Sequence, residues 1–177
     1  MESIYLDNAA TTQVAAEVAE VVLACMRQDF GNPSSAHRLG VVATEHIQAA
    51  KRVLLSALGD PLGRVGELVF TSGGTEADAL GVLGAARARA RAGKKIAILA
   101  TEHPAVLGAG TQLAGEGFSV TQVPVDPSGH ATPEAVADAC GPDTILLCCM
   151  LVNNELCTIT DVATLAAHTR RRSPNLH

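Results

Sequence analysis

Apolar residues recur every three or four positions in two segments near the amino terminus, and this spacing is typical of amphipathic helices. The first segment covers residues 13–29 and ends at the turn signal Phe30-Gly31-Asn32-Pro33. A second helix is expected to follow at once, with Ser34 or Ser35 as its capping residue, and to end near Leu58. Its apolar stripe comprises Ala43, His46, Ile47, Ala50, Val53, Leu54 and Ala57.

Beyond residue 62 the pattern changes to short β-branched or leucine-rich runs, each followed by a segment of helical length. The expected strands are residues 67–70, 96–100, 119–123 and 144–150, and the expected helices are residues 75–92, 104–115, 132–140 and 159–172. Repeated strand–helix units normally build a mainly parallel sheet that is covered on both faces. The sequence therefore predicts an α/β fold with a mainly parallel sheet flanked by helices and preceded by an amino-terminal helical segment.

These patterns assign residues 1–62 to the amino-terminal helical segment and residues 63–177 to a domain that carries the sheet. A chain of 177 residues with 47% hydrophobic and 18% charged content is long enough for one hydrophobic core and short for two. With three Phe, one Tyr and no Trp, the core must be built from Ala, Val, Leu and Ile.

Composition also limits the expected partners. A net charge of −5 gives no overall attraction to nucleic-acid phosphates or anionic lipids, and the few aromatic residues argue against a base-stacking surface. No window reaches the roughly 18 apolar residues of a spanning helix, and the acidic start does not resemble a signal peptide. Five cysteines without CxxC spacing are typical of free thiols in a reducing compartment. We therefore expect a soluble cytoplasmic protein with neither nucleic-acid nor membrane partners.

The first loop with candidate chemistry is Phe70-Thr71-Ser72-Gly73-Gly74-Thr75-Glu76, in which an expected strand runs through a glycine pair into a helix. Glycines let the backbone approach a bound group, while Thr75 and the first-turn amides offer hydrogen-bond donors to an anion. The loop is neither a Walker loop nor GxGxxG, and an ordinary Gly-Gly turn remains the alternative.

Two further loops carry candidate side chains. In Thr101-Glu102-His103-Pro104, His103 could act as a general acid or base or lie against a planar cofactor ring; the alternative is a helix-start residue beside a proline. In Asn153-Asn154-Glu155, an amide could donate to a phenolate or carboxylate oxygen, although this sequence also occurs in ordinary turns. Because parallel strands point the same way, the three loops should meet at one cleft.

Five motifs together resemble the cysteine desulfurase and selenocysteine lyase family, within class V of the fold-type I pyridoxal-phosphate enzymes. They are Tyr5-Leu6-Asp7-Asn8-Ala9-Ala10-Thr11-Thr12, Phe30-Gly31-Asn32-Pro33-Ser34-Ser35, the loop of residues 70–76, Thr101-Glu102-His103 and Val152-Asn153-Asn154-Glu155. They occur in the family's order and close to its spacings, over essentially the whole chain. The resemblance implies that residues 63–177 belong to an incomplete form of the family's large cofactor-binding domain.

The cofactor that the resemblance implies is pyridoxal 5'-phosphate. Gly74 and Thr75 would hold its phosphate through backbone amides and a hydroxyl, and His103 would stack on the pyridine ring and relay protons as a catalytic residue. Asn154 would lie beside the phenolic oxygen of the cofactor and the carboxylate of the substrate. The segment 8–12 would border the entrance of the site, and no metal site is expected.

The reaction that the resemblance implies removes sulfur from L-cysteine, giving L-alanine and an enzyme-bound persulfide for iron–sulfur cluster or thio-cofactor assembly. The alternative within enzymes is a selenocysteine lyase, with L-selenocysteine as substrate. Full-length members would form homodimers and pass sulfur to an acceptor protein. A third hypothesis is a non-catalytic binding or regulatory partner of a full-length subunit.

Some features of the family are missing from this sequence. The family's Schiff-base lysine, substrate-binding arginine and sulfur-accepting cysteine belong to a segment that the 177 residues do not include, so we expect a truncated chain that is inactive alone. Lys51, Lys94 and Lys95 are poor substitutes, because they fall on a helix or at the far end of a strand.

Two residues depart from the family's pattern within the matched motifs or beside them. Cys157 stands where the family usually has Gly, and a positive φ there would strain a cysteine by roughly 1 kcal/mol or more. Ala79 stands where the family often has Asn. Cys148 and Cys149 are adjacent on an expected strand, so their side chains should point to opposite faces and are poorly placed to chelate a metal together.

Overall fold

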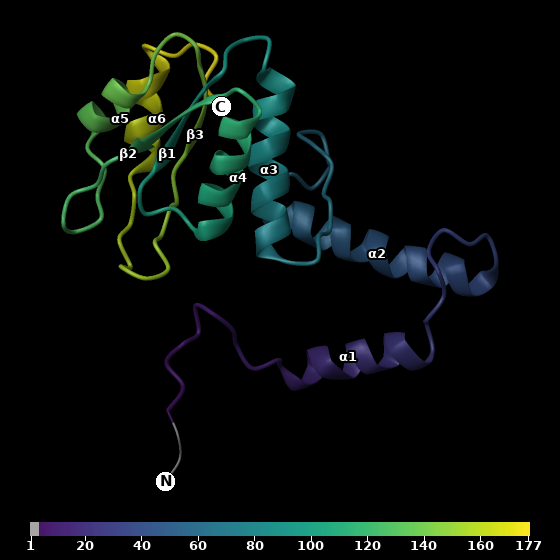
Figure 1. Cartoon of the computed structure of the whole chain (residues 1–177). Coiled ribbons are helices and arrows are strands. Elements are labelled where there is room, and N and C mark those ends of the chain that lie inside the picture. Colours follow the sequence, from purple (N-terminus) through teal and green to yellow (C-terminus); the bar gives the residue numbers. More distant parts are fainter. Residues whose placement is uncertain (1–3) are drawn as a thin grey trace. The chain divides into compact units, whose positions relative to one another are not determined.

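The computed structural model describes residues 4–177 and separates the chain into two compact units, Met1–Phe70 and Thr71–His177. Residues 1–3, part of the acidic start considered above, lie outside the described residues. The first unit contains two helices, α1 (Ala16–Arg27) and α2 (Arg38–Ala57) (Figure 1). Both helices of the expected amino-terminal segment are therefore present.

Helix α2 begins two or three residues later than the sequence indicated. Its N-cap is His37, whose Nδ1 accepts from the backbone N–H of Gly40 over 3.4 Å, rather than Ser34 or Ser35. The two serines are instead held in a turn by Asn32, which accepts from their backbone N–H groups through its side chain and its carbonyl, each over 2.9 Å. An asparagine side chain competes in this way with helix formation, so the turn delays the helix start.

The second unit alternates helices and strands. Its elements are α3 (Gly74–Arg89), β1 (Lys95–Leu99), α4 (Pro104–Gly115), β2 (Ser119–Val123), α5 (Pro133–Ala139), β3 (Thr144–Cys148) and α6 (Val162–Arg170). The strands form a parallel sheet in the order β2-β1-β3. This arrangement confirms the expected parallel α/β fold.

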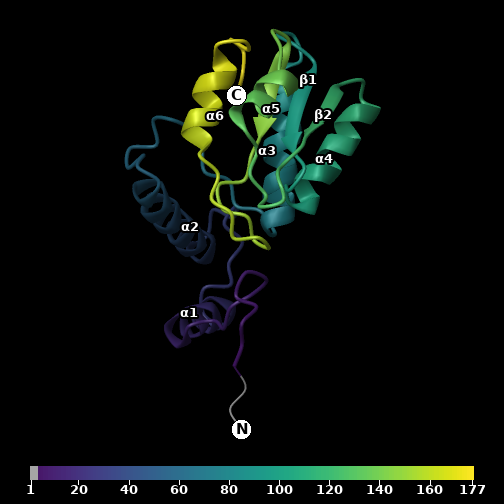
Figure 2. The same cartoon turned by 90° about the vertical axis from the view of Figure 1, so that its left-hand side faces the viewer.

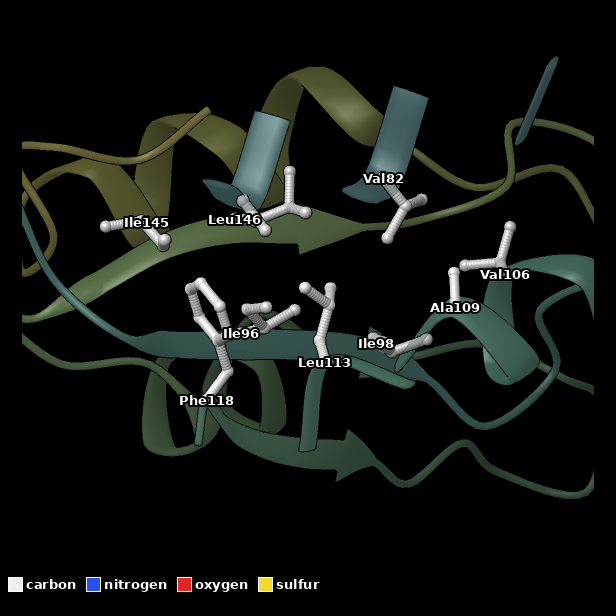
Figure 3. Packing of buried hydrophobic residues seen from close by; sticks show 10 residues of the cluster. Val82, Ile96, Ile98, Val106, Ala109, Leu113, Phe118, Ile145 and Leu146 are labelled. Carbon is white, nitrogen blue, oxygen red and sulfur yellow. The ribbon is translucent and has the colours of Figure 1, made fainter. Parts of the chain in front are cut away.

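Helices cover both faces of the sheet, and successive residues of β1 point to opposite faces. Ile96 and Ile98 pack with α3 and α4, and Figure 3 shows this cluster. Ala97 and Leu99 pack on the other face, with α5 and α6. Figure 2 shows α4 and α6 on the two sides of the sheet. A strand alternates its side chains between two faces, so the apolar run of four residues that follows Lys95 in β1 is stabilised by burial on both.

One expected strand, residues 67–70, is absent: this segment has no partner strand within the described part of the chain. Val69 is 59% exposed and Phe70 is 51% exposed, so burial does not hold the segment extended either. A strand needs a neighbouring ladder to satisfy its backbone groups, and composition alone does not supply one. Beside β3, the backbone N–H of His177 donates to the carbonyl of Ile145, and the carbonyl of His177 accepts from the N–H of Leu147.

Candidate functional site

The candidate loops of the second unit lie at the end of the sheet where its parallel strands finish. Figure 1 shows the loops after β1 and β3 and the first turns of α3 and α4 facing the same, lower side. Ligands of parallel α/β sheets usually bind at this edge, because loops from successive strands converge there. The fold therefore brings the sequence motifs after β1 and β3 into one region.

A cavity of about 270 Å³ lies between the loops after β1 and β3. This volume lies just below the range of about 300–1,000 Å³ that is usual for small-molecule sites. Both His103 and Asn154 line it, so two of the predicted site residues share one cavity although 51 positions separate them. Its lining residues are Ala100, Thr101, Glu102, His103, Pro104, Asn153, Asn154, Glu155 and Leu156.

His103 combines a structural contact with a free ring atom. It is the N-cap residue of α4, and its Nδ1 accepts from the backbone N–H of Ala105 over 3.1 Å. A ring nitrogen that accepts carries no proton, so the neutral imidazole holds its proton on Nε2. Asp78 on α3 places Oδ2 4.0 Å from the same Nδ1. His103 can therefore offer an Nε2–H donor to a ligand while Nδ1 caps the helix.

Gly74 and Thr75 occupy the first turn of α3, after Gly73 at the N-cap position. They do not line the cavity of His103 and Asn154. The nearest link is Asp78, which lies one turn further along α3 and approaches His103. A Cβ added to Gly74 would meet nothing within 4 Å, so the space at this helix start is open to a bound group.

The acidic side chain of this first turn faces away from the free amides. Glu76 accepts from the backbone N–H of Ser72 over 2.7 Å and from its hydroxyl over 2.5 Å. These hydrogen bonds lower the pKa of Glu76, the one to the hydroxyl contributing most. Glu76 thus braces the turn before α3, and the amides of Gly74 and Thr75 lie at the positive end of the helix dipole.

Asn153 is a structural residue that the sequence analysis did not separate from Asn154. It is buried, and its Nδ2 donates to the carbonyl of Thr101 over 2.8 Å. Its Oδ1 accepts from the backbone N–H groups of Glu155 and Leu156 over 2.9 and 2.8 Å. One side chain therefore closes the turn after β3 and attaches it to the loop after β1.

Glu102 is buried on the cavity wall, with 8% of its surface exposed. Within the described part of the chain, its Oε1 is buried without a hydrogen-bond partner. Burial raises the pKa of Glu102, and the nearby charge of Asp78 acts in the same direction. The sequence motif contained this residue, but nothing in the pattern of residues distinguished a buried glutamate from an exposed one.

The turn after β3 has the positive φ that was expected at position 157, where the family usually has Gly. Cys157 adopts φ +58°, the left-handed region that favours glycine. Its backbone N–H donates to the carbonyl of Asn153 over 3.0 Å, which closes the turn despite the cysteine. The strain expected at this position is therefore present in the backbone.

Cys148 is the last residue of β3, and Cys149 follows it directly. The side chains of these two cysteines point to opposite faces of the sheet, as expected. Cys148 packs against the cluster under α3 and α4, and Cys149 against the cluster under α5 and α6. Burial raises the pKa of Cys148 to about 12, so its thiol is an apolar filler rather than a nucleophile. No group of side chains within residues 4–177 has the arrangement of a metal site.

Comparison with known proteins places this geometry in a wider context. Residues 4–176 match the model of the aminotransferase class-V family. The chain is 41% identical to a cysteine desulfurase IscS of Methanosarcina thermophila over 161 residues, covering 91% of this chain and 39% of that protein. It is also 41% identical to a cysteine desulfurase IscS of Acinetobacter baumannii strain AYE, covering 98% of this chain and 43% of that protein.

Solved structures share the fold. A NifS-like protein superposes with a TM-score of 0.89 at 32% identity, over 98% of this chain and 48% of that one. DndA from Streptomyces lividans gives a TM-score of 0.77 at 40% identity, again over 98% of this chain and 48% of its own. A structure of SspA in complex with cysteine gives 0.83 at 30% identity, over 96% of this chain and 48% of that one.

The chain spans about two fifths of the length of the curated relatives it matches. The expected fold of a partial large domain of the fold-type I transferases agrees with these superpositions. In the part of the chain that the structure describes, no helix is both long and apolar enough to cross a membrane.

Proposed function

The chain belongs to the aminotransferase class-V family, and from this premise we propose that it provides the cofactor pocket of a cysteine desulfurase. The cysteine desulfurases and other class-V relatives are pyridoxal-phosphate enzymes. The observation that carries the proposal is the shared cavity of His103 and Asn154, which lies at the end of the sheet where such cofactors bind. Because the chain covers about two fifths of its relatives, the reaction is proposed for the complete architecture that they have.

The residues present fit pyridoxal phosphate. A phosphate needs hydrogen-bond donors at the positive end of a helix, and the first turn of α3 has amides at Gly74 and Thr75, the Thr75 hydroxyl and open space above them. A planar heterocycle needs a flat neighbour, which His103 supplies. A carboxylate needs a donor, which the amide of Asn154 supplies.

In this proposal the amino-acid substrate is L-cysteine. When bound, pyridoxal phosphate supplies an electron sink next to the substrate's α-carbon. The carbon–sulfur bond of cysteine breaks, its sulfur joins an acceptor thiol as a persulfide, and the carbon skeleton leaves as L-alanine. Cysteine plus thiol therefore gives alanine plus persulfide, with no outside oxidant or reductant.

We assign each residue of this chain a role in the proposed site. Thr75 and Gly74 bind and orient the phosphate, and Asn154 orients the substrate carboxylate. His103 would lie beside the ring and offer it the proton of Nε2, because Nδ1 accepts from the Ala105 N–H. His103 is the residue that we assign to proton transfer. A homodimer, a sulfur-acceptor protein that receives the persulfide, and a cytoplasmic location complete the proposal.

Binding of pyridoxal phosphate to the purified 177-residue chain tests this assignment. We expect saturable binding, measured by calorimetric titration, and a loss of affinity of about tenfold or more in each of Thr75→Val, His103→Ala and Asn154→Ala. His130→Ala is the matched control, since His130 lies in the loop after β2 and does not line this cavity. Equal affinity in all four variants, or no binding by the unchanged chain, would reject the assignment.

A further inference from the structure

The turn after β3 is a small hairpin that carries part of the candidate cavity. An antiparallel bridge joins Val152 to Ile159 at the base of this hairpin, and Asn154 and Leu156 between them line the cavity. Leu156 is the largest apolar side chain of a lining that is otherwise mostly polar. The proposed function uses Asn154 but gives no role to Leu156.

The loop after β2, which contains none of the sequence motifs, also contacts this hairpin. The buried Thr158 donates from its hydroxyl to the carbonyl of Ser128 over 2.6 Å. Next to Ser128, a Cβ added to Gly129 would lie 2.6 Å from Cδ1 of Leu156 and 3.0 Å from Oγ1 of Thr158. Since carbon atoms pack at roughly 3.5–4.0 Å, a larger residue at position 129 must displace its neighbours.

Asp126 holds the loop after β2 in a closed turn. Its carboxylate accepts from the backbone N–H groups of Ser128 and His130 over 2.8 and 3.0 Å. Its carbonyl accepts from the N–H of Gly129 over 2.9 Å, and Gly129 has φ +83°, a conformation that glycine adopts readily. Because these bonds fix the backbone of Gly129, the Leu156 side chain, which is 54% exposed, is the neighbour that can move.

We propose that Gly129 is a positioning residue of the candidate site, which determines where the Leu156 side chain lies in the cavity wall. A side chain at position 129 would displace Leu156 and reshape the cavity, although Gly129 itself does not line it. The cavity thus takes part of its shape from a third loop, in addition to the loops after β1 and β3. The inference concerns the same cavity as the proposed function and rests on it only for the identity of the ligand.

The first test uses the ligand-free 177-residue chain and the NMR signals of the Leu156 methyl groups, which are assigned by their absence in Leu156→Ala. We expect a nuclear Overhauser effect between a Leu156 methyl group and the Hα atoms of Gly129. In Gly129→Ala the methyl signals of Leu156 should shift, because the added Cβ displaces this side chain.

Gly117→Ala is the matched control for this change. Gly117 has φ +86°, and a Cβ there would meet nothing within 4 Å, so the substitution introduces similar backbone strain without the contact. It should leave the Leu156 methyl signals in place. Equal shifts in the two variants, or no Overhauser effect between Leu156 and Gly129 in the unchanged chain, would overturn the inference.

The second test compares affinity for pyridoxal phosphate, measured by calorimetric titration, with the urea midpoint of unfolding. Strain at a positive φ should lower the midpoint in both Gly129→Ala and Gly117→Ala. We expect Gly129→Ala to weaken binding by about fivefold or more, and Gly117→Ala by less than about twofold. A lower midpoint with unchanged affinity in Gly129→Ala would mean that Gly129 serves folding alone, contrary to the proposal.

A double variant tests whether the effect passes through Leu156. In a Leu156→Ala background the displaced side chain is gone, so Gly129→Ala should change affinity by less than about twofold. The same loss of affinity with and without Leu156 would contradict the proposal. Should Gly129→Ala alone not fold, a folded double variant supports crowding against Leu156, and an unfolded one contradicts it.

Failure of the proposed function leaves a different signature. Should the unchanged chain not bind pyridoxal phosphate while the Leu156 signals shift in Gly129→Ala and not in Gly117→Ala, the ligand assignment fails and the positioning role stands. Should the cofactor bind while these two variants show equal affinities and equal Leu156 signals, the positioning role fails and the ligand assignment stands.

Discussion

The side-chain amide of Asn153 donates to the carbonyl of Thr101 over 2.8 Å and so joins the two loops that carry the candidate site. The same side chain accepts from two backbone N–H groups within its own turn. All the hydrogen bonds that the structure shows for the Asn153 side chain are therefore made to backbone groups. Its neighbour Asn154 is exposed, lines the cavity and is the amide available to a ligand.

Replacing Asn153 should therefore destabilise the second unit without removing a ligand contact. In Asn153→Ala, the Thr101 carbonyl and the amides of Glu155 and Leu156 lose their partner. Since unsatisfied buried polar groups are costly, we expect a loss of about 2 kcal/mol in the free energy of unfolding, measured with urea.

Asn154→Ala is the matched control for that experiment. Because Asn154 is exposed, its replacement should change the free energy of unfolding by less than about 0.5 kcal/mol while weakening cofactor binding. Similar stability losses in the two variants would show that Asn153 has no special structural role.

Much of the fold follows from local patterns. The helix 104–115 coincides with α4 because Pro104 favours the first helical turn, and the strand 119–123 coincides with β2. The strand expected at 67–70 was wrong because pairing depends on a neighbouring strand, which composition does not reveal. The start of α2 was misplaced because Asn32 forms a local turn.

The candidate site was only partly accessible to the same reasoning. The positions of the motifs after two parallel strands predicted that His103 and Asn154 would lie at one edge of the sheet. The structure places both residues in one cavity. The burial of Glu102 and the connection that Asn153 makes could not be inferred, because burial and hydrogen-bond direction are properties of the packed chain. Both residues belong to the motifs of the sequence analysis, so adjacency to a candidate ligand residue was the available signal.

Cys157 offers a test of backbone strain. Its φ of +58° is readily adopted by glycine and costs a residue with a Cβ, so Cys157→Gly should raise the free energy of unfolding by about 1 kcal/mol. Cys157→Ala keeps the Cβ and removes the thiol, and it should give no such gain. A gain of the same size in both variants would assign the effect to the thiol.

The lysines of the sequence should form no specific covalent adduct with pyridoxal phosphate. Lys51 lies 3.8 Å from Glu67, Lys94 lies over the ring of Phe118 and Lys95 begins β1, the end of the strand opposite to the cavity. After borohydride reduction of the chain with the cofactor, mass spectrometry should find only low, scattered labelling of these lysines. A single stoichiometric adduct at any of them would contradict the site described here.

The buried carboxyl of Glu102 should give the unfolding free energy a recognisable pH dependence. Burial, the largest cause, raises the pKa of Glu102 above its ordinary value of 4.5, so the folded chain holds this proton more tightly than the unfolded chain does. The resulting stabilisation is fully present below the unfolded pKa. It is lost as the pH rises through the raised folded pKa.

Other carboxyl groups affect the free energy of unfolding in a different pH range. Hydrogen bonds lower the pKa values of Glu76, Asp126 and Asp161, so the stability that they contribute is lost as the pH falls below their ordinary values. These groups are unchanged in Glu102→Gln and cancel in the difference between the two proteins. The difference above pH 4.5 therefore isolates Glu102.

We expect Glu102→Gln to gain stability relative to the unchanged chain as the pH rises from 4.5 toward neutrality, because the amide cannot ionise. Urea unfolding at a series of pH values measures this difference. Glu155→Gln, which removes an exposed carboxyl from the same cavity wall, should show no comparable trend. Parallel stability curves for Glu102→Gln and the unchanged chain would mean that Glu102 ionises as readily in the folded chain as in the unfolded chain, and its burial would then have no energetic consequence.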